Sequence, residues 1–525
     1  MFICHLKALR DAIYCCCFFV GFSNTKMDRR RKHKKKLKDF GREYFLDISV
    51  NALKHIIRAK NVGERRFWLV MFTLALFGTG FCVLEVWKVY ESSFTKTIIL
   101  STSYLYSETP FPSVTICEPS RVYGPVIKAL YDNSSGKPGS YDEAVFKIMA
   151  TLTTIRLPLF EDFIEIKKFE RHYDELNKLN ISDMLLKAVR PCNTIFDSPC
   201  WWRNNYYNCC ELFELQKTCY GYCYSFNSDV SEFSKRKTQF YGMMHHENFN
   251  YWIDERGTFK RPRRTGGSGP WSGLWFSMRA QKIPSYINAK SGIVVMIRDP
   301  SALPIDRGMM VAKGTSGYIK VWGDKVIPTK RLIRVKPEKR RCLYPDEKTY
   351  LGRGYLRSNC LFNCYQRFMF HDCKCVPSFY YFHYEKDLPY PECNVEGLVC
   401  LAEHSSNFIN IVDRDKNLST NLRCKCPGDC RSQKYKSNIV VLNETSSADQ
   451  ITVDVFFHRS TCFLYETDIV FDFMNALVGY GGVCGLFLGA SLISAVEFIN
   501  FMTFRLYDYW LNRRHRNKIV QRFIH

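Results

Sequence analysis

The sequence lacks the common signatures of enzymes. It has no Gly-x-Ser-x-Gly turn, no His-Glu-x-x-His helix, no phosphate-binding loop and no cluster of zinc ligands at suitable spacing. No internal repeat or low-complexity spacer divides it either. These absences argue against an ectoenzyme, and we expect a protein that is not an enzyme and holds no metal or cofactor.

Charge is missing from two long stretches near opposite ends of the chain. Residues 67–84 are eighteen consecutive uncharged residues, and residues 473–496 are twenty-four. A helix needs about 20 residues to cross a hydrocarbon core roughly 30 Å thick. Buried helices of soluble proteins seldom run so long without a charge. We therefore predict membrane spans at residues 67–87 and 473–504, rather than two core helices.

Lysine and arginine crowd the outer flanks of both predicted spans. A basic run occupies residues 26–38, and the second span is followed by Arg505, Arg513, Arg514, Arg516 and Lys518. Positive charge close to a span marks the cytoplasmic side. Residues 1–66 and 505–525 are thus expected to be cytoplasmic tails at the plasma membrane, and residues 88–472 to lie outside the cell.

The net charge of +24 does not predict a nucleic-acid partner. The basic run at 26–38 has no interleaved aromatic residues and belongs to no recognisable nucleic-acid fold. It either contacts anionic lipids of the inner leaflet or is a solvated, disordered charge run. The preceding Cys15, Cys16 and Cys17 are either palmitoylation sites in a cytoplasmic tail or part of an inert leader.

Cysteines place the segment between the spans in an oxidising compartment. Eighteen of the 24 cysteines fall there, an even number that allows up to nine disulfides. Four glycosylation sequons agree, at Asn133, Asn180, Asn417 and Asn443. The expected disulfide cysteines are Cys117, Cys192, Cys200, Cys209, Cys210, Cys219, Cys223, Cys342, Cys360, Cys364, Cys373, Cys375, Cys393, Cys400, Cys424, Cys426, Cys430 and Cys462.

Zinc binding is the alternative use of the closely spaced cysteines. Cys373 and Cys375 are separated by one residue, as are Cys424 and Cys426, which Cys430 follows. Zinc ligands on one segment are usually separated by two to four residues. The spacing therefore favours disulfides.

Residue patterns between the spans predict a mixed α+β domain. β-Branched residues indicate strands at 111–117, 293–297 and 439–442, and apolar periodicity indicates helices at 146–153 and 173–189. The glycine-rich stretch at 266–270 is typical of a loop.

A set of motifs occurs in a specific order between residues 45 and 504. After the strand at 111–117 come residues 221–227, the Ser-Gly-Leu turn at 272–274, the run Cys424-Lys-Cys-Pro-Gly-Asp-Cys430 with Tyr435, and residues 485–491. The spaced set between them is Cys342, Tyr355, Cys360, Cys364, Cys373, Cys375 and Pro377. On these residues the chain resembles subunits of the degenerin/epithelial sodium channel family, and most of all the insect pickpocket branch.

The resemblance implies a homo- or heterotrimer of related subunits. Each ectodomain would combine a β-sheet palm with helical finger and thumb elements. The channel would pass Na⁺ passively, be of the amiloride-sensitive type, and open in response to a ligand or a mechanical tether. The resemblance also places the selectivity filter at Gly489, Ala490 and Ser491.

The second span carries small residues at four-residue spacing. Gly481, Gly485 and Gly489 lie on one helical face, which is typical of close helix packing. Glycine also makes a helix easy to break, and non-helical backbone at membrane depth is tolerated where it lines a water-filled path. A break at residues 489–491, repeated in three chains, would give a ring of oxygens that replaces part of a cation's hydration shell. Further pore or gate candidates are Gly479, Gly482, Gly485 and Glu497, and the resemblance implies Asn475 as a gate residue.

Acidic residues bracket the second span. Glu466, Asp468 and Asp472 precede it and are expected at the outer mouth, where they would attract cations. They are otherwise ordinary linker charges. Glu497 near the inner end either lines the pore or pairs with Arg505.

One family feature is altered. The family carries a His-Gly pair before the first span, and here His55 is followed by Ile56. A β-branched residue at positive φ is strained. Either this segment has another shape, or the subunit opens poorly alone, as a non-conducting regulatory subunit would. A membrane-anchored receptor or adhesion ectodomain is the second alternative.

Overall fold

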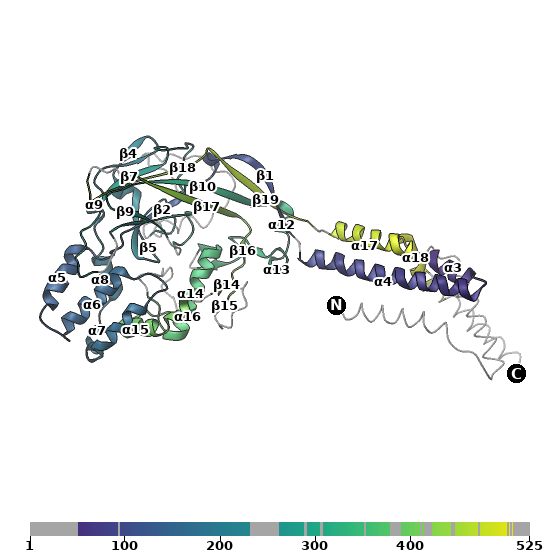
Figure 1. The fold of residues 1–525 in the computed structure, drawn as a ribbon, viewed down its shortest axis with the longest axis horizontal. Helices are drawn as coiled ribbons and strands as arrows, with labels where there is room; N and C mark the ends of the chain where they lie inside the picture. Colours follow the sequence, from purple (N-terminus) through teal and green to yellow (C-terminus); the bar gives the residue numbers. More distant parts are fainter. Residues whose placement is uncertain are drawn as a thin grey trace. The chain divides into compact units, whose positions relative to one another are not determined.

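The computed structural model forms two compact units, residues 1–94 with 470–525 and residues 95–469 (Figure 1). We refer to the second unit as the ectodomain. The residues that the structure describes are 51–92, 95–231, 262–287, 291–304, 308–350, 353–377, 390–409, 412–413, 423–442, 447–470, 473–500, 503–504 and 507.

The described residues of the first unit form four named helices. They are α3 (Asn51–Arg58), α4 (Val62–Ser92), α17 (Phe473–Leu488) and α18 (Leu492–Asn500). Among the described residues, Val62–Glu91 is the one helix long and apolar enough to cross a membrane. Only 6% of its most apolar window is buried, which argues against a core helix of a soluble domain. The predicted first span, 67–87, lies inside this helix.

The ectodomain contains two large sheets. The first has the order β1-β19-β10-β18-β7-β3-β4, with β17 also paired to β10, and the second has the order β5-β6-β2-β8-β9. Strands of the first are β1 (Thr95–Leu105), β19 (Thr461–Ile469), β10 (Ser316–Pro328), β18 (Gln450–Phe457), β7 (Leu274–Arg279), β3 (Cys200–Trp202), β4 (Asn205–Tyr207) and β17 (Ser432–Leu442). Those of the second are β5 (Phe213–Thr218), β6 (Gly221–Phe226), β2 (Ser113–Cys117), β8 (Gly292–Arg298) and β9 (Met309–Ala312).

Alternating apolar residues of both sheets share one core. Phe226 and Ile293 come from the second sheet, Phe276 and Val455 from the first, and all four are fully buried. Gly273 allows the closest approach in this core, because a Cβ there would lie 2.1 Å from the carbonyl oxygen of Val455.

The larger helices form a second core on one side of the sheets (Figure 1). They are α5 (Gly124–Ser134), α6 (Tyr141–Thr154), η2 (Glu161–His172), α7 (Tyr173–Leu176), α8 (Ile181–Lys187), α14 (Arg357–Cys373), α15 (Val395–Glu403) and α16 (Ser405–Ile409). The short elements are η1 (Tyr106–Glu108), α9 (Cys192–Ile195), α10 (Cys209–Leu212), α12 (Lys330–Ile333), α13 (Pro337–Arg340), β11 (Cys342–Leu343), β12 (Thr349–Tyr350), β13 (Arg353–Gly354), β14 (Val412–Asp413), β15 (Arg423–Cys424) and β16 (Gly428–Asp429). The α+β expectation is confirmed as a sheet-rich, disulfide-rich domain.

The helix predicted at residues 173–189 is wrong in one respect, because the structure has two helices there. α7 ends at Leu176, and α8 begins after Asn180. The Asn180 side chain accepts a hydrogen bond from the backbone N–H of Asp183 at 2.9 Å. This capping bond starts a new helix and stops the first from continuing through the position.

Eight disulfides join sixteen of the eighteen expected cysteines. Cys360 and Cys364 are one turn apart on α14, so they share a face, and they bind Cys426 and Cys424 respectively. The other bridges are Cys117–Cys223, Cys192–Cys210, Cys200–Cys209, Cys342–Cys430, Cys373–Cys400 and Cys375–Cys393. Cys219 and Cys462 take part in none of these eight, because they are buried in different hydrophobic clusters.

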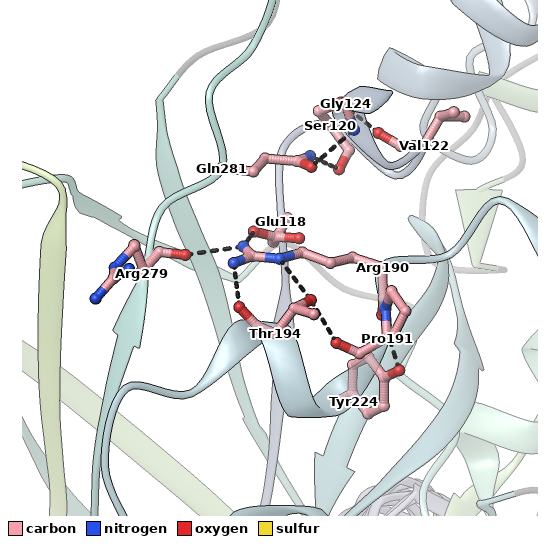
Figure 2. A network of polar contacts seen from close by, with 10 residues as sticks. All are labelled: Glu118, Ser120, Val122, Gly124, Arg190, Pro191, Thr194, Tyr224, Arg279 and Gln281. Carbon is pink, nitrogen blue, oxygen red and sulfur yellow. Dashed lines mark hydrogen bonds and ion pairs between the residues drawn. The ribbon is translucent and has the colours of Figure 1, made fainter. Parts of the chain in front are cut away.

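A buried arginine joins the sheets to the helices, as Figure 2 shows. Arg190 follows α8, and its Nη1 donates to Glu118 Oε1 at 2.7 Å and to the Arg279 carbonyl at 2.8 Å. Its Nε donates to Thr194 Oγ1 of α9 at 3.2 Å. Tyr224 of β6 donates its hydroxyl to the Arg190 carbonyl at 3.0 Å. One side chain thus ties the residue after β2, the end of β7 and α9 together.

Candidate functional site

The candidate site is the interrupted helix in the second apolar run. α17 has 16 residues and is therefore about 24 Å long. It ends at Leu488, and the next residue, Gly489, has a φ of +63°, a left-handed conformation that favours glycine. The interruption coincides with residues 489–491, the three residues that the sequence marks as a break.

The hydrogen bonds of the interruption leave two carbonyls of α17 without their helical donors. The N–H of Ala490 donates to the Cys484 carbonyl at 3.3 Å, and the N–H of Ser491 donates to Ser494 Oγ at 3.0 Å. In a continuous helix these two donors would bond the carbonyls of Leu486 and Phe487. The regular pattern of helical hydrogen bonds is therefore broken at this point of the chain.

Ser491 directly precedes the next helix, α18, and caps it. Its Oγ accepts from the N–H of Ser494 at 3.4 Å, while the Ser494 hydroxyl accepts from the N–H of Ser491. This is the reciprocal arrangement of a capping box, with serine in place of glutamate. Sequence reasoning missed Ser494, although the Ser-x-x-Ser spacing would have indicated it.

Two faces of α17 have different surroundings within the first unit. Phe487 packs on α4, where a Cβ added at Gly78 would lie 2.7 Å from its ring. At Gly481 and Gly482 an added Cβ would meet no described atom within 4 Å. At Gly485 it would meet only the Ala490 carbonyl, at 3.8 Å. Within the described part of the chain, Gly481, Gly482 and Gly485 are therefore not covered by other helices.

The remaining pore candidates lie along the same two helices. Asn475 donates from its side chain to the Val470 carbonyl at 3.0 Å, near the start of α17. Gly479 is partly exposed in the middle of α17, and Glu497 is partly exposed on α18. Arg505, the alternative partner of Glu497, lies outside the described residues.

The three expected outer acids have different surroundings. Glu466 lies in β19, opposite Ile98 of β1. Asp468 accepts from Thr329 Oγ1 at 2.7 Å and from Arg331 at 3.4 Å. The hydrogen bond from Thr329 is the largest cause that lowers the pKa of Asp468. Its charge is therefore already partly satisfied, whereas Asp472 lies outside the described residues.

The His55–Ile56 pair lies in a helix. Both residues belong to α3, and the His55 ring stacks on Trp68 of α4 with centroids 4.3 Å apart. A β-branched residue is tolerated at helical φ, so Ile56 is not strained here. Of the two explanations for the altered pair, this geometry favours a segment of different shape.

Several other expected sites have definite places. Asn133 in α5 and Asn180 before α8 are exposed, and the sulfurs considered for zinc are all in disulfides. The predicted sites that lie outside the described residues are Asn417, Asn443, the basic run at 26–38, Cys15, Cys16 and Cys17, and most of the C-terminal tail at 505–525.

Comparison with known proteins agrees over most of the chain. Residues 44–501 match the family model described as amiloride-sensitive sodium channel. The chain is 24% identical to pickpocket protein 19 of Drosophila melanogaster over 488 residues, covering 87% of this chain and 88% of that protein. It is also 24% identical to pickpocket protein 28 of the same organism over 532 residues, covering 91% and 81%.

A shorter match, 23% identical over 239 residues, is to acid-sensing ion channel 2 of Rattus norvegicus and covers 41% of this chain and 42% of that protein. Pickpocket proteins, for which the sequence motifs had indicated a resemblance, are thus among its relatives. The family match covers well over half of the 525 residues. The chain therefore belongs to the amiloride-sensitive sodium channel family, whose members are membrane ion channels and not enzymes.

Proposed function

We propose that this chain is a subunit of a sodium-permeable cation channel of the plasma membrane. It assembles as a homo- or heterotrimer with related subunits, and Na⁺ passes along a path lined by α17 and α18 of each chain. An extracellular ligand or a mechanical tether gates this path. The observation that carries the proposal is the interruption of an apolar helix at Gly489, Ala490 and Ser491.

The topology follows from the compartment of the disulfides. Eight bridges between Cys117 and Cys430 require an oxidising environment, which places the ectodomain outside the cell. α4 precedes this unit and α17 follows it, so each crosses the membrane once. Residues 473–500 together are long enough for the second crossing. Both termini are then cytoplasmic, where the basic flanks can contact anionic lipids.

The interruption gives the ion path its chemistry. Irregular backbone at membrane depth is stable only where it is buried in protein or faces water. The open glycine face lets three copies of α17 approach closely around an axis. Released carbonyls near Leu486 and Phe487, with the Ser491 hydroxyl, then form a ring of oxygens for a partly dehydrated cation. Glu497 adds negative charge toward the inner end.

Voltage clamp of cells that express the full chain, alone and with related subunits, tests the proposal. Gly489→Ala forces a residue with a Cβ into a left-handed conformation, so we expect an altered sodium-to-potassium permeability ratio. Gly80→Ala is the matched control, because an added Cβ there meets no described atom within 4 Å. This control should conduct like the unmodified chain.

The outcomes separate the alternatives. A current that appears only with a partner, and whose selectivity does not change in the Gly489→Ala variant, identifies a regulatory subunit. Surface-expressed trimers that neither conduct nor alter any partner's current would overturn the channel proposal and favour a receptor or adhesion role.

A further inference from the structure

Four residues from distant parts of the chain form a row across the first sheet. In the strand register Tyr206 of β4 is opposite Trp201 of β3, Trp201 is opposite Trp275 of β7, and Trp275 is opposite Asp454 of β18. Directly opposite residues on neighbouring strands project from the same face of a sheet. The other face carries the buried Trp202 and Leu274, so the row lies on the outer face.

A fifth residue, Trp271, is held over this row. Its backbone N–H donates to Asp454 Oδ2 at 3.0 Å, and its carbonyl accepts from Trp201 Nε1 at 2.8 Å. Its ring stacks on Trp275 with centroids 5.4 Å apart. Trp271 has φ +66°, a strained conformation for a bulky residue that persists only where its surroundings impose it.

Tyr206, Trp271 and Trp275 border an open hollow of about 390 Å³ on the surface. It is lined by Ser198, Pro199, Tyr206, Trp271 and Trp275. Tyr206 is 65% exposed and Trp271 is 47% exposed, although large aromatic rings usually bury their faces. The volume lies within the usual range of small-molecule sites, about 300–1,000 Å³.

A buried carboxylate, Asp454, holds the backbone of Trp271 and is opposite Trp275, two residues that line the hollow. Asp454 is 2% exposed, and its Oδ1 has no hydrogen-bond partner within the part of the chain that the structure describes. Burial raises the pKa of Asp454 to about 6, and the hydrogen bond from the Trp271 N–H lowers this pKa by a smaller amount. The group is thus mostly ionised at neutral pH. A buried and only partly satisfied negative charge is costly unless a cation is near it.

We propose that this hollow is a binding site for a small organic ammonium cation of the quaternary, choline-like type. The faces of Tyr206, Trp271 and Trp275 attract such a cation through their negative π faces, and the Asp454 carboxylate adds charge complementarity. The inference deepens the proposed function by naming a class of extracellular ligand. Its role in gating rests on that proposal, whereas binding itself can be measured without any current.

The probe pair for the test is choline and 3,3-dimethylbutan-1-ol, which has the same shape without the charge. Both are titrated calorimetrically into the purified full chain in detergent. We expect choline to bind at least tenfold more tightly than the neutral alcohol. Equal affinities would reduce the hollow to an ordinary apolar pocket, and an absence of choline binding at millimolar concentrations would equally overturn the proposal.

Variants locate the binding. Tyr206→Leu should weaken choline affinity by roughly 5- to 30-fold, and Tyr206→Phe, which retains the ring, should stay within about threefold of the unmodified chain. Trp322→Leu is the matched control, since Trp322 is an exposed tryptophan of the same sheet. If Trp322→Leu loses as much choline affinity as Tyr206→Leu, the assignment of the binding site to this hollow is wrong.

Asp454→Asn tests the charge separately. The amide oxygen can still accept the Trp271 N–H, so the loop keeps its position while the negative charge is lost. Choline should bind at least fivefold more weakly to this variant, and the neutral alcohol should bind as before. If choline binds but no channel test succeeds, the binding site is supported and the channel proposal is not. If the chain conducts but does not bind choline, the channel proposal is supported and this ligand is not.

Discussion

Arg190 donates from Nη1 to Oε1 of Glu118 at 2.7 Å, and their side chains are only 9% and 13% exposed. Burial raises the pKa of Glu118 above its ordinary value, although Arg190 opposes this. The desolvation of Glu118 therefore exceeds the attraction of its partner. Such a pair contributes little net stability, but it is costly to break from one side.

Arg190→Met should destabilise the ectodomain by about 3–5 kcal/mol, because it leaves a buried glutamate without its cation. Thermal unfolding of the purified full chain measures this as a lower melting temperature. Adding Glu118→Gln to this variant should restore part of the loss. Arg279→Met is the control for loss of a mostly exposed cation: its side chain is 69% exposed and pairs with Asp197 at 3.0 Å, so its removal should cost less than that of Arg190.

Asp454→Asn should raise stability at neutral pH. The folded-state pKa of Asp454, about 6, lies above the ordinary 3.8, so its contribution to stability is present below about pH 4 and lost as the pH rises through 6. The variant does not titrate and escapes this loss, roughly 3 kcal/mol for a shift of about two units. Its melting temperature should exceed that of the unmodified chain at pH 7.5.

The same comparison at pH 4 should show little difference between the two proteins. Asp449→Asn serves as the control, because Asp449 is a half-exposed carboxylate that precedes the same strand. It should follow the unmodified chain at both pH values. At each pH, the melting temperature of the Asp454→Asn variant is compared with that of the unmodified chain. If the variant's advantage is smaller at pH 7.5 than at pH 4, the assignment of a buried charge is contradicted.

The thiol of Cys462 should resist alkylation in the folded protein. Burial raises its pKa to about 11, so almost no reactive thiolate exists at pH 8. Iodoacetamide should label Cys462 only after denaturation, without prior reduction. Peptides with Cys360 or Cys364 should need reduction first. Mass spectrometry that finds Cys462 in a disulfide would refute this thiol assignment.

Gly78→Ala should disturb the packing of the two apolar helices. The added methyl would lie 2.7 Å from the Phe487 ring, and overpacking of this kind typically costs about 1–3 kcal/mol. A lower melting temperature in detergent measures the effect, and Phe487→Leu should restore part of it. Gly80→Ala, two residues along α4, meets no described atom and should be neutral. Equal effects at both glycines would contradict the packing.

The features that the sequence predicted best depend on neighbouring residues. The first apolar helix follows from the absence of charge at 67–84, and the interruption of the second follows from glycine at 489, the residue type that adopts positive φ with little strain. The split of the helix at 173–189 depends on one capping hydrogen bond to the Asn180 side chain. A pattern of apolar residues does not reveal whether such a bond forms.

The features that sequence reasoning missed depend on long-range register. Trp201, Trp275 and Asp454 become neighbours only because β3, β7 and β18 pair in a particular alignment. Nothing local to any of them indicates the others. Disulfide partners were likewise unpredictable, since a count of cysteines leaves many connectivities open. Cys219 and Cys462 keep the number of cysteines between the spans even, yet they belong to none of the eight bridges.

The paired bridges from α14 give that helix an unusual response to pulling. Cys360 and Cys364 fix a full helical turn covalently to Cys426 and Cys424. A force that pulls α14 away from the segment 424–426 acts on two disulfide bonds, whereas in a helix without such bonds it would act on backbone hydrogen bonds, which break at lower force. The turn between Cys360 and Cys364 therefore resists unwinding under load, and it transmits the force to the parts of the chain on either side.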